Sequence, residues 1–159
     1  MNKQLVVQKV IDHLVNELEL FHRAARAAFE EATDEHNKSE SKYDTRGLEA
    51  SYLARGQARQ VAETEQAIAQ YKSLTVADWK PGAPIALGAY VELERGKDRM
   101  CYLLGPCAGG TELKHAGREI LVITPQSPLG RQLIGRKEGE RIQLELGGAK
   151  REHKVAAVQ

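Results

Sequence analysis

Apolar residues recur at alternating steps of four and three along the N-terminal part of the chain. They are Val7, Ile11, Leu14, Leu18, Phe21, Ala25, Ala28 and Ala32. This heptad spacing places a single apolar seam along an α-helix, and neither Gly nor Pro occurs before Gly47. The spacing therefore predicts a helix over about Lys3–Ala32, which at about 1.5 Å of rise per residue is roughly 45 Å long.

A second helical pattern runs over about Thr45–Leu74. Its apolar positions are Ala54, Val61 and Ile68, seven residues apart, with Ala50, Ala58 and Tyr71 between them. Neither apolar stripe is stable when exposed, so the two segments are expected to pack as an antiparallel helical hairpin, a coiled coil, over residues 1–76. Large seam residues lie toward the base of this hairpin and alanines lie toward the connection, so we expect the hairpin to taper.

The connection between the two helical patterns is strongly acidic. Residues Glu30–Asp44 contain six carboxylates and two lysines. We expect an acidic tip at about residues 33–44, and its candidate functional acids are Asp34, Glu35, Glu40 and Asp44. Charged connections between helices are also commonly just solvated loops, so this alternative stays open at this point.

The pattern changes after Leu74, where Gly and Pro divide short apolar runs. Five runs predict strands: Ile85–Glu94, Arg99–Gly105, Glu119–Pro125, Arg141–Leu146 and His153–Val158. Gly147 and Gly148 predict a hairpin turn between the last two. One short helix is expected between them, with Ser127 as its N-cap, Pro128 at its first position and Gly135 at its end. The chain is thus predicted to be α+β, with a linker at 77–84 and a compact domain at 85–159.

Composition excludes several functional classes. We find no apolar run long enough to span a membrane and no signal peptide, so a cytoplasmic protein without membrane association is expected. The net charge of +1 argues against nonspecific coating of nucleic acid. Cys101 and Cys107 have no further ligand at zinc-site spacing, and no nucleophile arrangement stands out. We therefore expect neither an intrinsic metal site nor catalysis by the isolated chain.

The stretch that begins "ITPQSPLGRQLIGRKEGE" resembles a known family. It is similar to the pattern S-P-[IL]-[AG]-R-x-L-[IL]-G-[KR]-x-x-G-[DE] in the C-terminal domain of the GreA/GreB bacterial transcript cleavage factors. The matching residues are Ser127, Pro128, Leu129, Gly130, Arg131, Leu133, Ile134, Gly135, Arg136, Gly139 and Glu140. The order of hairpin, linker and domain also resembles that family, which implies an FKBP-like C-terminal domain.

The resemblance implies a function together with RNA polymerase. In the family, the globular domain docks at the rim of the polymerase secondary channel and the hairpin enters the channel. Tip acids then help the polymerase to hold a second Mg²⁺ near the 3′ end of the nascent RNA, so that backtracked RNA is cut by the polymerase itself. For this chain the resemblance implies a monomer with no cofactor other than this shared Mg²⁺. The docking candidates are Ser127, Pro128, Arg131, Arg136 and Lys137, although the three basic residues are equally consistent with a solvated helix face.

The tip departs from the family pattern, which reads approximately G-D-L-x-E-N-A-E-Y. Aligning Tyr43 with its tyrosine places His36, Ser39 and Lys42 where the family has acids. A regulator that occupies the channel without supporting cleavage is therefore a second hypothesis. A third is an FKBP-like prolyl isomerase or chaperone. It needs a pocket lined by aromatic rings, yet Tyr90 and Tyr102 are the only Phe, Trp or Tyr residues after Pro81.

Overall fold

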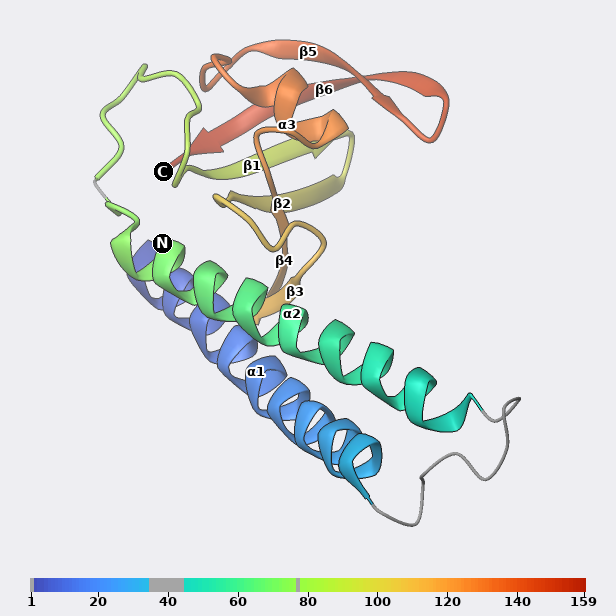
Figure 1. Ribbon diagram of the computed structural model, residues 1–159. Helices are drawn as coiled ribbons and strands as arrows, with labels where there is room; N and C mark the ends of the chain where they lie inside the picture. Colours follow the sequence, from blue (N-terminus) through green and yellow to red (C-terminus); the bar gives the residue numbers. More distant parts are fainter. Residues whose placement is uncertain (1, 35–44, 77) are drawn as a thin grey trace. The chain divides into compact units, whose positions relative to one another are not determined.

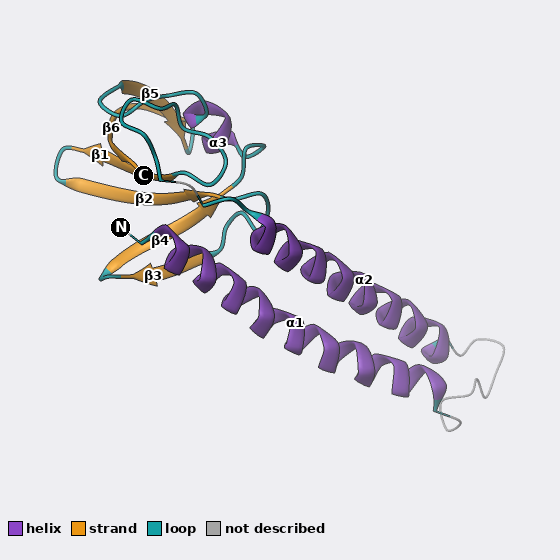
Figure 2. Ribbon diagram, turned by 90° about the vertical axis from the view of Figure 1, so that its left-hand side faces the viewer, coloured by secondary structure: helices purple, strands orange, loops and turns teal. Residues whose placement is uncertain are grey.

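The computed structural model describes residues 2–34, 45–76 and 78–159. Two long helices come first, α1 (Lys3–Thr33) and α2 (Arg46–Ser73), and they lie side by side in both views (Figures 1 and 2). The predicted helical hairpin followed by a β-sheet domain is confirmed. Both helices begin and end within one residue of the predicted limits, because the heptad spacing is a local property of the sequence.

The hairpin seam is mostly as predicted. Leu14 and Ala28 of α1 are each only 4% exposed, whereas Leu18 and Phe21 are half-buried. In α2, the buried positions are Ala50, Thr64, Ile68 and Tyr71.

The prediction that Ala58 of α2 lies in the seam is wrong. Ala58 is exposed, and Gln57 takes the seam position beside it, with its Oε1 atom buried. The steps of three and four that run through Ala50 and Ala54 reach Gln57 and Val61. Spacing thus decides the buried face here, even though it brings a polar residue inward.

A six-stranded sheet forms the rest of the molecule, in the order β3-β4-β2-β1-β6-β5. Its elements are β1 (Tyr90–Arg95), β2 (Asp98–Leu104), β3 (Glu112–His115), β4 (Arg118–Ile123), α3 (Pro128–Leu133), β5 (Arg141–Leu146) and β6 (Ala149–Val158). Neighbouring strands are antiparallel except for β2 and β4, which are parallel. Gly147 and Gly148 both have positive φ and form the two-residue turn between β5 and β6, as the sequence predicts.

Two strand predictions need correction, and one strand was missed. The first strand begins at Tyr90 rather than Ile85, because Gly88 has a φ of 85° and Ala89 N–H donates to Ala86 in a turn. The last strand begins at Ala149, and β3 was not predicted. This short strand (sequence ELKH) contains one apolar residue and takes its register from β4.

The apolar core lies on the face of the sheet that α3 covers. It contains thirteen buried residues: Ile85, Ala89, Val91, Leu93, Tyr102, Leu104, Ile123, Leu129, Leu133, Ile142, Leu144, Val155 and Val158. Trp79, from the predicted linker, packs against this core and donates from Nε1 to Ala83 O at 3.3 Å. The Lys3 ammonium lies 5.1 Å from the Trp79 ring centroid, and burial lowers the pKa of this lysine.

The chain divides into two compact units. One contains Met1–Val10 and Gln70–Gln159, and the other is Ile11–Ala69. The ends of the two long helices nearest the sheet therefore belong to the sheet unit. Two hydrogen bonds connect them to it: Tyr71 Oη donates to Cys107 O at 2.9 Å, and Lys9 Nζ donates to Lys114 O at 2.7 Å.

Candidate functional site

The short helix α3 is built as its sequence predicts. Ser127 has extended backbone angles, and its Oγ accepts from Gly130 N–H at 3.0 Å while donating to Thr124 O at 2.8 Å. Pro128 occupies the first helical turn, and Leu129 and Leu133 are buried against the core. A capped first turn is thus held rigidly on the sheet, which fixes where the following residues leave the helix.

The segment after α3 is attached to the start of the domain. Gly135 has a φ of 80° and donates to Ile85 O at 2.9 Å, while Ile85 N–H donates to Arg136 O at 2.7 Å. This pair of main-chain bonds holds Ile134 at the surface with 44% of its area exposed. The segment therefore presents an apolar side chain next to a basic one.

A groove of about 490 Å³ lies between the end of α3 and β5. It is lined by Arg131, Gln132, Ile134, Gly135, Arg136, Glu140, Ile142 and Gln143. The structure thus brings the docking candidates Arg131 and Arg136 to one groove, where Arg136 Nη1 lies 3.6 Å from Glu140 Oε2. Ser127, Pro128 and Lys137 do not line it. The first two position α3, and Lys137 is exposed just beyond.

Of the four candidate tip acids, one lies within the described residues. Asp34 is exposed and follows directly after α1, whose last residue, Thr33, donates from Oγ1 to Phe29 O at 2.9 Å. Glu35, Glu40 and Asp44 lie outside the described residues. By chain order they belong to the connection between the end of α1 and the start of α2.

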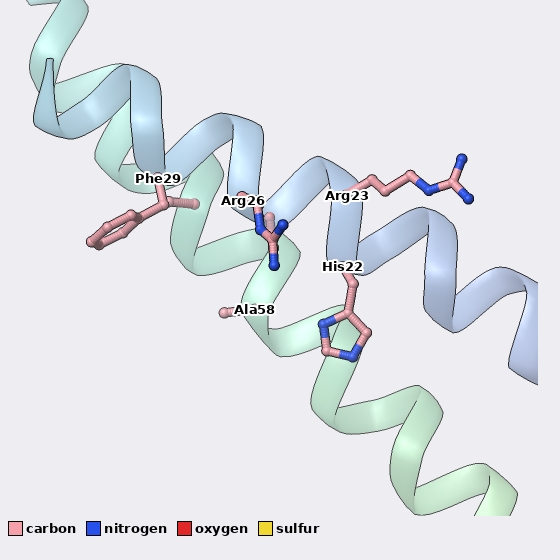
Figure 3. Close-up of a pocket in the computed structure, with 7 residues that line it drawn as sticks. His22, Arg23, Arg26, Phe29 and Ala58 are labelled. Carbon is pink, nitrogen blue, oxygen red and sulfur yellow. The ribbon is translucent and has the colours of Figure 1, made fainter.

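A second groove, of about 560 Å³, lies on the hairpin near this connection. It is lined by His22, Arg23, Ala25, Arg26, Phe29, Ala54 and Ala58. Figure 3 shows His22, Arg26 and Phe29 along α1, with Ala58 of α2 beside them. The Phe29 side chain is 62% exposed, so this groove combines an open aromatic ring with basic groups. Sequence reasoning missed Phe29, whose position off the heptad seam was the available signal.

Sequence reasoning also missed a polar cluster on the sheet. Glu92 of β1 is 5% exposed, and its carboxylate pairs with Arg118 Nη1 and accepts from Tyr90 Oη at 3.3 Å. Arg99 Nη1 lies 3.7 Å from the second carboxylate oxygen. Burial raises the pKa of the Tyr90 phenol, so it stays a neutral hydrogen-bond donor near pH 7. The cluster satisfies a buried charge and connects β1, β2 and β4.

Within residues 2–34, 45–76 and 78–159, no three His, Cys, Asp or Glu side chains gather closely enough to hold a metal ion. No helix in these ranges is long and apolar enough to cross a membrane.

A family model decides the affiliation of the chain. The model described as "Transcription elongation factor, GreA/GreB, C-term" matches residues 80–159, which contain the sheet, α3 and both Arg residues of its groove. The chain belongs to the GreA/GreB family. A search of curated proteins found no match.

Several solved structures are similar to this GreA/GreB-family chain. GreA factor homolog 1 (Gfh1) of Thermus thermophilus is 22% identical, with 94% of each chain covered and a TM-score of 0.41. Thermus aquaticus Gfh1 is 23% identical, with 92% of each chain covered and a TM-score of 0.41. A GreA/GreB elongation factor from Nitrosomonas europaea is 17% identical over 70% of this chain and 91% of its own, with a TM-score of 0.37.

Proposed function

We propose that this protein binds RNA polymerase, docks through its sheet unit at the rim of the secondary channel, and inserts its hairpin into the channel to modulate elongation. The observation that carries this proposal is the GreA/GreB family match over residues 80–159. The chain would work as a monomer in the cytoplasm. Its groove at Arg131 and Arg136 supplies a basic docking surface for an acidic patch of the polymerase.

The hairpin suits insertion into a narrow channel. Helix α1 has 31 residues, which corresponds to a length of roughly 45 Å. Its acidic end would bring carboxylates to the polymerase active centre, where hard Mg²⁺ prefers oxygen ligands and retains several waters. Two metal ions stabilise both the attacking and the leaving oxygen. The cleavage chemistry and the Mg²⁺ would then belong to the polymerase, and the chain would not be an enzyme by itself.

A second candidate function keeps the docking but omits cleavage. The tip sequence favours it, because His36, Ser39 and Lys42 take the places of acids in the family pattern. A channel-occupying protein without properly placed carboxylates would block or reshape access to the active centre instead of recruiting a metal ion.

The prolyl isomerase alternative needs accessible aromatic rings in a substrate pocket. Tyr90 is fully buried and Tyr102 is only 7% exposed. Little of either ring is therefore accessible to a substrate, which argues against this alternative.

Two assays on the full chain test the proposal. Co-purification with core RNA polymerase, followed by competition with a known secondary-channel factor, tests docking; failure to bind polymerase would refute it. Transcript cleavage by stalled elongation complexes in Mg²⁺ then separates the two functions. If the cleavage role is correct, replacing Asp34, Glu35, Glu40 and Asp44 by their amides abolishes stimulated cleavage while binding persists. The matched control is Glu19→Gln, an exposed acid on α1 away from the tip.

A further inference from the structure

The six-stranded sheet has two edge strands, β3 and β5, and one main-chain group of each is bonded to a side chain from outside the sheet. At the β3 edge, Lys9 Nζ donates to Lys114 O at 2.7 Å. At the β5 edge, Gln132 of α3 accepts through Oε1 from Glu145 N–H at 3.1 Å. Each of these bonds occupies one main-chain group of an edge strand, which is a common way to prevent unwanted strand pairing. Only the C-terminal end of β5 is covered in this manner.

The hairpin geometry identifies the main-chain groups of β5 that point outward. The two-residue turn makes Leu146 and Ala149 a hydrogen-bonded pair, so alternate residues of β5 bond to β6. Arg141, Gln143 and Glu145 therefore direct their N–H and C=O groups away from the sheet. The bond from Glu145 N–H to Gln132 agrees with this assignment. Among the described residues, no hydrogen bond engages the outward groups of Arg141 or Gln143.

These open main-chain groups lie next to the groove at the end of α3. Ile142 and Gln143 line that groove, and Ile134 opposite them is 44% exposed. Arg131 has no carboxylate partner among the residues that the structure describes. The site therefore combines unpaired strand groups, an apolar side chain and an unneutralised cation.

We propose that the Arg141–Gln143 edge of β5 binds an extended, acidic segment of RNA polymerase by strand addition. Another extended main chain matches the alternating donors and acceptors along a strand edge. An apolar residue of the segment would cover Ile134, and a neighbouring carboxylate would pair with Arg131. Because Gln132 blocks the edge at Glu145, the added strand is short. This inference rests on the proposed polymerase docking and specifies how it is made.

Two substitutions of Gln143 separate main-chain pairing from side-chain contact. Gln143→Ala retains the outward N–H, whereas Gln143→Pro removes it. Neither change removes a ladder bond to β6, because Gln143 points away from that strand. We expect Gln143→Pro to bind core RNA polymerase roughly tenfold more weakly than Gln143→Ala, the loss expected for about one hydrogen bond in a desolvated contact. Arg131→Gln should also weaken binding, whereas its control Lys150→Gln, on the exposed side of β6, should not.

Hydrogen exchange of the unmodified chain gives a second readout that does not depend on a proline variant folding correctly. In the free protein, the unbonded amides of Arg141 and Gln143 should exchange quickly, whereas those of Ile142 and Leu144 should exchange slowly. Addition of core RNA polymerase should protect Arg141 and Gln143.

The outcomes distinguish this inference from the proposed function. If the unmodified chain does not bind polymerase, both are wrong. If it binds but the Pro and Ala variants have equal affinity and the two amides remain unprotected, strand addition is wrong and polymerase docking stands.

Discussion

Gly105 follows β2 at a point where the sheet unit has no space for a side chain. A Cβ atom added there would overlap the Tyr71 hydroxyl oxygen, and it would lie 2.9 Å from Tyr71 Cζ and 3.2 Å from Val122 Cγ1. Tyr71 is 1% exposed and donates its hydroxyl to Cys107 O at 2.9 Å. The ring is thus enclosed and cannot swing toward solvent. Gly105→Ala must therefore displace the ring and break this hydrogen bond.

The expected cost of Gly105→Ala is the sum of two effects. Loss of the hydrogen bond costs about 1 kcal/mol, and overpacking of an enclosed site costs about 1–3 kcal/mol. The free energy of unfolding should then fall by about 2–4 kcal/mol. Tyr71→Phe alone should cost about 1 kcal/mol, because it removes the donor without displacing the ring.

A double-mutant cycle tests this reasoning. With the hydroxyl removed by Tyr71→Phe, the nearest clash disappears, so Gly105→Ala should cost at least about 1 kcal/mol less in that background. Urea unfolding followed by tryptophan fluorescence measures all four proteins, since Trp79 is the single tryptophan and packs against the core of the same unit. If Gly105→Ala costs less than about 0.5 kcal/mol, or the same amount in both backgrounds, the enclosed Tyr71 contact is wrong.

Three further predictions use the same unfolding assay. Arg118→Met should lower the free energy of unfolding, because it leaves the buried Glu92 carboxylate without its nearest cation. Glu92→Gln should lower it less, since no charge is then buried; equal losses for the two variants would contradict the role of the charge. Burial raises the pKa of Tyr71, so above pH about 10 the unfolded state ionises while the folded state does not. Stability should therefore decline as the pH rises through this range, and Tyr71→Phe should make the decline shallower; an unchanged slope would contradict this. Ser127→Ala should lower the free energy of unfolding by about 1 kcal/mol, because it removes the cap on Gly130 N–H, and Ser127→Asp should recover most of this loss. A loss below about 0.3 kcal/mol for Ser127→Ala would contradict the role of the cap.

Local patterns predicted most of the fold. The heptad positions of α1, the cap at Ser127 and the glycine turn between β5 and β6 each depend on residues within a few positions of one another. The exposed Ala58 shows the limit of this approach, because alanine occurs on both the buried and the solvent face of a helix. Only the spacing of the whole seam, which includes Gln57, distinguishes the two faces.

The contacts that sequence reasoning missed join residues that are far apart in the chain. Glu92 and Arg118 are 26 residues apart, and Lys9 and Lys114 are 105 residues apart. The first pairing depends on strand order, and above all on the parallel pairing of β2 with β4. The second needs the first part of α1 to lie beside β3, and no local pattern specifies either arrangement. The groove at Arg131 has the same origin, because it needs β5 to lie beside the end of α3.

The distal half of the hairpin reverses the usual distribution of side-chain size. Its seam contains Ala28 at 4% exposure and Ala50 at 6%, while Phe29 and Tyr52 are each 62% exposed and Leu48 is 57% exposed. A hairpin selected for its own stability would bury the large apolar side chains, since each contributes about 1.5–3 kcal/mol when fully buried. Alanines inside allow a close approach of the two helices and keep the arm thin, whereas the exposed apolar side chains are accessible to a partner. A slim arm with aromatic groups outward is less stable alone but suits insertion between the walls of a channel, which supports the proposed role of the hairpin independently of its acids.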